Sequence, residues 1–182
     1  VLVIFTTSIL SLFFLSPGKL RLFAESVFSS LVFITNIYFY FFGNFYGAGE
    51  SLNKPLLHLW SLGIEEQFYI LYPIILLIIL RYFNNLLLFF LIFGALSSLF
   101  LAQIVAPDSR MFNFYMLPTR AWEILSGSII AYLFFFNRIN INWNHIFLNL
   151  LYAISLLIVF LSLFFFNINK VDHPSIVTLI PI

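Results

Sequence analysis

The sequence predicts an all-α fold, a polytopic bundle of transmembrane helices. Of 182 residues, 63% are hydrophobic, 21% are aromatic and only 8% are charged, whereas a soluble domain carries roughly 25% charged residues. The apolar residues are grouped in runs close to the length of about 20 residues that an α-helix needs to cross a bilayer. Twenty-six Phe residues bring more apolar surface than one soluble core can hide, whereas lipid accepts it directly.

The apolar runs set the order of the expected helices. A first run ends at Ser16-Pro17-Gly18 and predicts the tail of a span. Residues 24–42 contain several hydroxyl and amide side chains, which predicts either a span that lines the interior or a tilted helix near the interface. The segment Gly43 to Lys54 predicts a polar loop. Later spans are expected at residues 56–82, 84–106, 118–136 and 145–166, and another begins at Ser175.

The charges in the short turns indicate an orientation. Arg81 and Arg138 occupy turns on one side of the expected bundle. The opposite turns carry both signs, at Asp108, Arg110, Lys170 and Asp172. Because cytoplasmic loops carry an excess of Lys and Arg, Arg81 and Arg138 are expected on the cytoplasmic side. The end of the span that carries His58 and the end of the span that carries Arg120 then face the outside of the cell.

Composition also limits the chemistry and the partners. The chain contains no Cys, which leaves no disulfide, thiolate metal site or cysteine nucleophile in it. His145 and His173 lie in turns without spaced ligand partners, so no metal site is expected. The net charge of +1 gives no basis for a nucleic-acid partner, and the apolar surface indicates membrane lipids. Because the chain starts and ends within apolar runs, we expect residues 1–182 to form a single transmembrane domain truncated at both ends.

A concentration of polar side chains precedes the apolar run that starts at Ile70, where an ionised carboxylate is costly unless it is used. Pro55 stands where a helix can begin. At about 100° per residue, one helix face then carries His58, Ser61, Glu65, Tyr69 and Tyr72. A histidine and a carboxylate two turns apart can supply general acid/base chemistry. Glu66 and Gln67 rotate away from this face, which makes Glu66 a candidate for a hydrogen bond to a neighbouring helix.

A second group of polar residues lies in the segment LPTRAWE, residues 117–123. Pro118 opens a helix, and Arg120 and Glu123 are close enough along it to pair with each other or to reach another segment. In the functional interpretation, Arg120 binds an anionic or carbonyl group of a substrate. Further along the same helix, Gly127 and Ala131 form a face of small residues that allows another helix to approach closely.

Structural interpretations remain open beside the functional ones. Buried polar side chains also join helices to one another in membranes, which applies to single members of either group and to Asn36. The Arg120 and Glu123 pair can simply hold a helix end in place. Trp60 and Trp122 can stack on a sugar or anchor the helices at the membrane interface, and anchoring is favoured for isolated tryptophans.

Four segments together resemble acyltransferase family 3. They are SPG at 16–18, TNIY at 35–38, HLWSLGIEEQFY at 58–69 with Pro73 shortly after it, and LPTRAWE at 117–123. The resemblance covers roughly residues 12–136, in order. It implies a bacterial multi-span membrane protein of the inner (plasma) membrane that O-acylates glycans of the cell envelope, such as polysaccharide, lipopolysaccharide, peptidoglycan or a lipid-linked sugar. It also implies acyl-CoA, expected as acetyl-CoA, as a co-substrate, with no bound cofactor.

The resemblance also implies which residues take part. Glu65 matches the characteristic acid of the family, and His58, Glu66 and Tyr69 join it as catalytic candidates. The substrate-binding candidates are Arg120, Glu123, Trp60, Ser61, Gln67 and Trp122. A further histidine and arginine of the family's first span have no counterpart in these residues. We expect that histidine to act as base or acyl carrier, oriented by Glu65, with Arg120 or Tyr69 contacting the donor or the oxyanion.

Two other classes of protein fit the same residues. A proton-coupled transporter or a membrane sensor would use His58 and Glu65 as a proton relay, since membrane proteins move protons through such side chains. A transporter often shows interrupted spans in two related halves, which are not evident here. A purely structural membrane subunit would require Glu65 only for stability.

Overall fold

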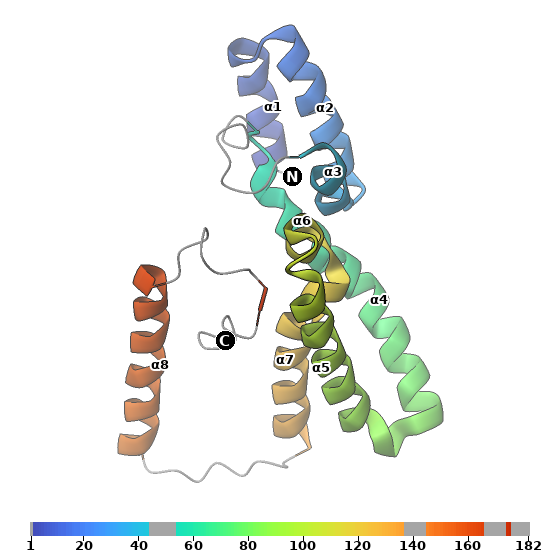
Figure 1. Ribbon diagram of the computed structural model, residues 1–182, viewed down its shortest axis with the longest axis vertical. Helices are drawn as coiled ribbons and strands as arrows, with labels where there is room; N and C mark the ends of the chain where they lie inside the picture. Colours follow the sequence, from blue (N-terminus) through green and yellow to red (C-terminus); the bar gives the residue numbers. More distant parts are fainter. Residues whose placement is uncertain (1, 44–53, 137–144, 166–173, 176–182) are drawn as a thin grey trace. The chain divides into compact units, whose positions relative to one another are not determined.

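The computed structural model describes residues 2–43, 54–136, 145–165, 174 and 175. All regular elements in these ranges are helical, which confirms the predicted all-α class (Figure 1). The elements are α1 (Leu2–Phe14), α2 (Pro17–Leu31), α3 (Thr35–Phe42), η2 (Leu57–Leu59), α4 (Trp60–Phe83), η3 (Asn84–Leu86), α5 (Leu87–Val105), α6 (Arg110–Tyr115), α7 (Leu117–Phe135) and α8 (His145–Phe165).

One continuous helical segment of the described chain, Leu57–Val105, is long and apolar enough to cross a membrane. It runs through η2, α4, η3 and α5, and it contains one helix of 24 residues and one of 19. Shorter apolar helical stretches lie at Leu2–Phe14 and Leu148–Ser162. The structure therefore supports one membrane-crossing segment by length and composition, and the polytopic bundle stays a prediction.

The expected stretch at residues 24–42 is divided in the structure. α2 ends near Val32 and α3 starts at Thr35, so a single span over this stretch is wrong. The division occurs at Phe33, whose φ of 58° lies in the left-handed region. The amide of Phe33 donates to the carbonyl of Ser30 (3.3 Å) and the amide of Ile34 to that of Ser29 (2.9 Å). These are the paired hydrogen bonds of a Schellman motif, with Phe where Gly is usual.

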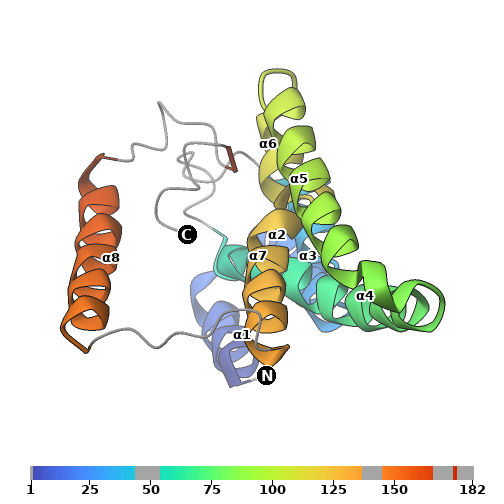
Figure 2. The same ribbon diagram turned by 90° about the horizontal axis from the view of Figure 1, so that it is seen from below.

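The described residues form two compact units. The first unit comprises Val1–Leu77 and Tyr115–Leu117, and the second comprises Ile78–Phe114 and Pro118–Ile182. α2 and α3 of the first unit lie side by side (Figure 1, Figure 2). The first unit buries these apolar side chains: Phe23, Phe39, Leu56, Leu57, Trp60, Ile64, Phe68 and Tyr115.

Small side chains line the contact between α2 and α3. Ser26, Ser29 and Ser30 are buried, and their hydroxyls donate to carbonyls of their own helix. Thr35 of α3 donates to the hydroxyl of Ser30 across 3.2 Å. Small residues allow two helix backbones to approach closely, and internal hydrogen bonds satisfy their hydroxyls where water is excluded.

α5 and α7 pack within the second unit. A Cβ at Gly94 of α5 would lie 3.3 Å from the side chain of Leu125 of α7. The second unit buries Leu87, Leu91, Ala102, Ala106, Phe114 and Trp122. The expected approach of a helix to Gly127 is not seen among the described residues, because no heavy atom lies within 4 Å of a Cβ built there.

Candidate functional site

His58 lies in the short helix η2, directly before α4. Pro55 and Leu56 form a turn, and the amide of Leu57 donates to the carbonyl of Lys54 (3.1 Å). The prediction that an α-helix begins at Pro55 is therefore wrong, since α4 starts only at Trp60. The regular 100° spacing applies from Ser61 onward, and His58 precedes it in a tighter 3₁₀ turn.

One side of the start of α4 is exposed. His58, Glu65 and Tyr69 are exposed, and Ser61 and Glu66 are half-buried. Ser61 donates to the carbonyl of His58 (3.3 Å). In the described part of the chain, no hydrogen bond or ion pair joins Glu65 or Glu66 to another side chain, so the predicted interhelical bond of Glu66 is not observed there.

The opposite side of α4 packs against α3 through an amide pair. Gln67 donates its Nε2 to Asn36 Oδ1 (2.8 Å) and to the carbonyl of Phe33 (2.9 Å). Asn36 donates its Nδ2 to the carbonyl of Tyr115 (3.0 Å) and, at 3.4 Å, to Gln67 Oε1. Asn36 is fully buried. This contact confirms that Asn36 hydrogen-bonds a neighbouring helix, and it makes Gln67 rather than Glu66 the partner from α4.

Gly63 allows this contact to form. A Cβ at Gly63 would lie 3.1 Å from Asn36 Oδ1 and 3.4 Å from both the Asn36 amide nitrogen and the Phe33 carbonyl oxygen. The backbones of α3 and α4 therefore approach too closely here for a larger residue without adjustment. This role of Gly63 could not be predicted, because a single glycine in an apolar helix has no distinctive spacing.

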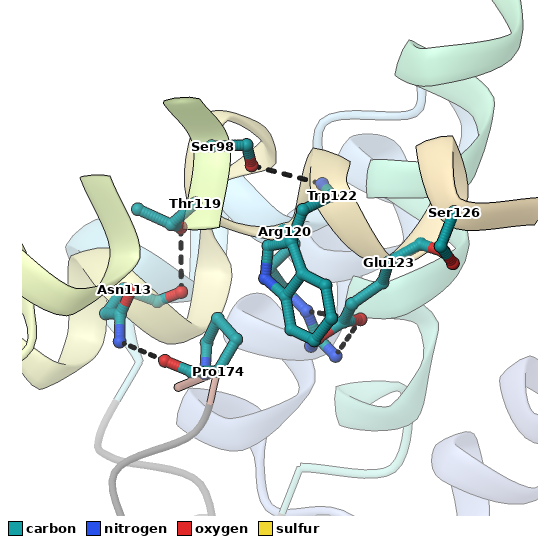
Figure 3. A network of polar contacts seen from close by, with 8 residues as sticks. All are labelled: Ser98, Asn113, Thr119, Arg120, Trp122, Glu123, Ser126 and Pro174. Carbon is teal, nitrogen blue, oxygen red and sulfur yellow. Dashed lines mark hydrogen bonds and ion pairs between the residues drawn. The ribbon is translucent and has the colours of Figure 1, made fainter. Parts of the chain in front are cut away.

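Arg120 and Glu123 form an ion pair on the first turns of α7 (Figure 3). Arg120 Nη2 lies 2.9 Å from Glu123 Oε2, and Arg120 Nε lies 3.3 Å from the same oxygen. The two side chains are only 13% and 21% exposed. The Arg120 guanidinium also lies over the ring of Phe114, 5.6 Å from its centroid. The expected pairing within α7 is therefore confirmed.

A serine from α5 holds the start of α7 (Figure 3). The Ser98 hydroxyl donates to the carbonyl of Pro118 (2.7 Å) and accepts from the amide of Trp122 (3.1 Å). These two backbone groups are the pair that an α-helix normally joins through its own i to i−4 bond. A side chain inserted at that point fixes the helix start and can bend it. Ser98 was not a sequence candidate, since nothing distinguishes one serine in an apolar run.

Further polar contacts surround this turn. Thr119 Oγ1 donates to the carbonyl of Asn113 (2.8 Å), and Asn113 Nδ2 donates to the carbonyl of Pro174 (3.0 Å). Within the described ranges, the buried atoms Asn113 Oδ1 and Trp122 Nε1 have no hydrogen-bond partner. The polar groups around Thr119 therefore serve mainly the packing of the second unit.

Both candidate tryptophans are buried. Trp60 is 8% exposed and meets Tyr115 edge-to-face, with ring centroids 5.5 Å apart. Trp122 is 2% exposed. An interfacial anchor exposes its ring to the membrane boundary, so the favoured anchoring interpretation is wrong for the described structure. Their role in substrate binding stays a prediction.

Tyr38 of α3 contacts a charged pair on α2. Its hydroxyl lies 3.3 Å from Glu25 Oε2 and 3.2 Å from the carbonyl of Leu22, and Glu25 pairs with Arg21 at 3.2 Å. Burial raises the pKa of Tyr38 to about 12, and the charge of Glu25 and its hydrogen bond act in the same direction. Tyr38 therefore stays a neutral donor at physiological pH.

Some sequence expectations lie outside the described residues. They include Arg138, Lys170 and Asp172, which entered the orientation argument, and His173, which entered the expectation about metal sites. Most of the loop from Gly43 to Lys54 also lies outside the described residues. Within the ranges that are described, no group of three or more His, Cys, Asp or Glu side chains could hold a metal ion.

Known proteins share part of this sequence. Peptidoglycan O-acetyltransferase OatA of Listeria monocytogenes is 32% identical over 133 residues, which are 70% of this chain and 21% of OatA. This similarity to a named O-acetyltransferase supports the resemblance to acyltransferase family 3. A second relative is the putative peptidoglycan O-acetyltransferase YrhL of Bacillus subtilis, 30% identical over 120 residues, which are 63% of the chain and 19% of YrhL. The matched region thus spans about a fifth of each of these acyltransferases.

An uncharacterized protein of Haemophilus influenzae is 27% identical over 172 residues, which are 90% of the chain and 68% of that protein. No protein-family model matches the chain. No solved structure matches it significantly. The relationship to acyltransferase family 3 therefore rests on the named O-acetyltransferases, and it supports the resemblance seen in the sequence.

Proposed function

We propose that the complete protein is a multi-pass O-acyltransferase of the inner membrane. It transfers an acetyl group from acyl-CoA to a hydroxyl of a cell-surface glycan or a lipid-linked sugar. In this reaction the glycan oxygen forms a bond to the acyl carbon, the carbon–sulfur bond of the thioester breaks, and CoA leaves as the thiol with the proton of the hydroxyl. The observation that carries the proposal is the match over 133 residues to a protein named peptidoglycan O-acetyltransferase.

The exposed side of α4 supplies suitable chemistry for this reaction. A hydroxyl acceptor needs a base, and the tetrahedral intermediate needs donors for its oxyanion. Glu65 is an exposed carboxylate with no partner among the described side chains, and His58 and Tyr69 are exposed near it in the sequence. We assign Glu65 to orient the catalytic histidine expected from the family, and Tyr69 to contact the donor or the oxyanion.

The test is the substitution Glu65→Gln in the complete protein. It keeps the shape of the side chain and removes the charge, so acetyl transfer to the glycan should be abolished while the protein stays in the membrane at its normal level. Glu25→Gln is the matched control, because Glu25 also lies in the first unit but belongs to an exposed ion pair of small energetic value. The control should retain the acetyl content of the parent protein.

Two outcomes would contradict the proposal. Unchanged acetyl content in Glu65→Gln would remove Glu65 from the mechanism. A complete parent protein that acetylates no glycan but moves protons or a solute across the membrane would favour the transporter interpretation instead. The named O-acetyltransferase relatives support the transferase over the transporter.

A further inference from the structure

We propose that Asn36 and Gln67 are positioning residues, whose paired amides fix the rotation of the first turns of α4 about its axis and thereby the direction of Glu65. In this role neither amide contacts a substrate, and for Gln67 it replaces the substrate-binding role expected from the sequence. The proposal depends on the proposed function only for the importance of Glu65, since the geometry of the amide pair is independent of any reaction.

In the pair formed by Asn36 and Gln67, both hydrogens of each side-chain amide group are donated in hydrogen bonds. Gln67 Nε2 uses both of its hydrogens, toward Asn36 Oδ1 (2.8 Å) and the Phe33 carbonyl (2.9 Å). Asn36 Nδ2 also uses both, toward the Tyr115 carbonyl (3.0 Å) and Gln67 Oε1 (3.4 Å). The bonds of Gln67 join α4 to α3 and to the turn before α3, and the bond from Asn36 joins α3 to the segment at Tyr115. The bonds of Gln67 would break if α4 turned about its axis by one residue.

Helix geometry links Gln67 to Glu65. Two residues along an α-helix correspond to about 200°, so the side chains of Glu65 and Gln67 point to nearly opposite sides. The structure agrees, because Glu65 is exposed while Gln67 contacts α3. Holding Gln67 against Asn36 therefore holds Glu65 on the exposed side.

Trp60, Ile64 and Phe68 pack one side of the first turns of α4, but beyond them apolar packing alone would leave the rotation weakly determined. From Ile70 onward α4 exposes large apolar side chains on all of its sides, including Ile70, Leu71, Ile74, Ile75 and Leu77. In lipid such sides are nearly equivalent, because lipid tails are as apolar as leucine. A single buried polar contact can set the register of an otherwise apolar helix pair, as a lone asparagine does in coiled coils.

Two neighbouring residues, Gly63 and Phe33, allow the Asn36 and Gln67 side chains to meet. Because Gly63 has no side chain, α3 approaches α4 closely at this position. A Cβ at residue 63 would lie only 3.1 Å from Asn36 Oδ1. Phe33, whose carbonyl accepts from Gln67, holds a left-handed φ of 58° that is unfavourable for a residue with a side chain. Gly63 serves the contact between α3 and α4, and Phe33, whose left-handed φ belongs to the motif that ends α2, presents its carbonyl to Gln67.

The experiment measures helix rotation by cysteine labelling, which is clean because residues 1–182 contain no Cys. In the complete protein, with any cysteine outside this segment replaced by serine, single cysteines are placed by Leu62→Cys and Ile64→Cys. Leu62 is 42% exposed and Ile64 is 4% exposed. N-ethylmaleimide should therefore label the first position much faster than the second in the parent background.

Gln67→Leu removes all the side-chain hydrogen bonds of Gln67 at similar volume. We expect it to lower the ratio of the two labelling rates by about tenfold, the factor that corresponds to about 1.4 kcal/mol. Gln103→Leu, at an exposed position in α5, is the matched control and should leave the ratio unchanged. Asn36→Ala is the second variant, which keeps the bond from Gln67 to Phe33 and should shift the ratio in the same direction.

An unchanged ratio in Gln67→Leu would overturn the proposal, whatever the acetyl transfer of that variant. Loss of folded protein in both Gln67→Leu and Asn36→Ala would also overturn it, because the pair would then support folding as a whole. If the ratio falls as expected while the parent protein acetylates no glycan, the positioning role holds and the proposed function fails. The two failures are therefore distinguishable.

Discussion

The starts of α4 and α7 carry similar residue types but hold them differently. At the start of α4, Glu65 is exposed and has no partner among the described side chains, while Gln67 and Asn36 make the structural contacts. At the start of α7, Arg120 and Glu123 pair with each other and are mostly buried. A carboxylate that is already paired contributes to structure, whereas an exposed and unpaired one is free to react.

This difference favours a division of roles. The start of α7 is held by Ser98 from α5 and by the Arg120 and Glu123 pair, which matches the interpretation that the pair holds a helix end in place. At the start of α4, Gln67 faces α3 on one side of the helix, and the candidate reacting groups Glu65 and Tyr69 lie on the exposed side. We therefore place the chemistry on α4 and leave substrate contact by Arg120 and Glu123 as a prediction.

The largest expected effect on stability comes from Gly63→Ala. The added methyl group would lie 3.1 Å from Asn36 Oδ1 and 3.4 Å from the Phe33 carbonyl oxygen. Because part of this contact is backbone, we expect a loss of about 1–3 kcal/mol, typical of overpacking. Gly127→Ala is the matched control, since nothing lies within 4 Å of its Cβ, and it should stabilise α7 by up to about 1 kcal/mol.

Thermal unfolding of the purified protein in detergent measures both glycine variants. A Gly63→Ala protein as stable as Gly127→Ala would show that α3 and α4 are not in close contact at Gly63. The claim that one side of the start of α4 packs closely against α3 would then be wrong.

A smaller effect is expected from Ser98→Ala. It removes the hydroxyl that bonds both the Pro118 carbonyl and the Trp122 amide, so we expect a loss of about 1 kcal/mol in unfolding free energy. Ser97→Ala is the control from the next position, where the hydroxyl is exposed and bonds only its own helix, and its loss should be close to zero. Equal unfolding temperatures for the two variants would remove Ser98 as the residue that holds the start of α7.

The sequence predicted the long helices because their apolar runs set their lengths. The runs at residues 56–82, 84–106, 118–136 and 145–166 correspond within a few residues to α4, α5, α7 and α8. The division between α2 and α3 was missed, because Phe33 takes the left-handed position that a glycine would have marked. The short helix α6 was also missed, since it lies in a segment expected as a turn.

The candidate site was predicted in part. The exposed side with Glu65 and Tyr69 follows from helical spacing, whereas His58 lies in the 3₁₀ turn before that helix. Gly63 and Ser98 could not be selected, because their roles depend on which helix packs against them and a single sequence does not reveal helix partners. The burial of Trp60 and Trp122 was missed for the same reason.

The most direct test compares Glu65→Gln with Glu123→Gln in the complete protein, by glycan acetyl content and by unfolding temperature. Glu65→Gln should abolish acetylation at an unchanged unfolding temperature, because the carboxylate has no partner to lose among the described side chains. Glu123→Gln should lower the unfolding temperature, because the ion pair with Arg120 is lost. A Glu65→Gln protein that unfolds at a lower temperature yet acetylates normally would contradict the account.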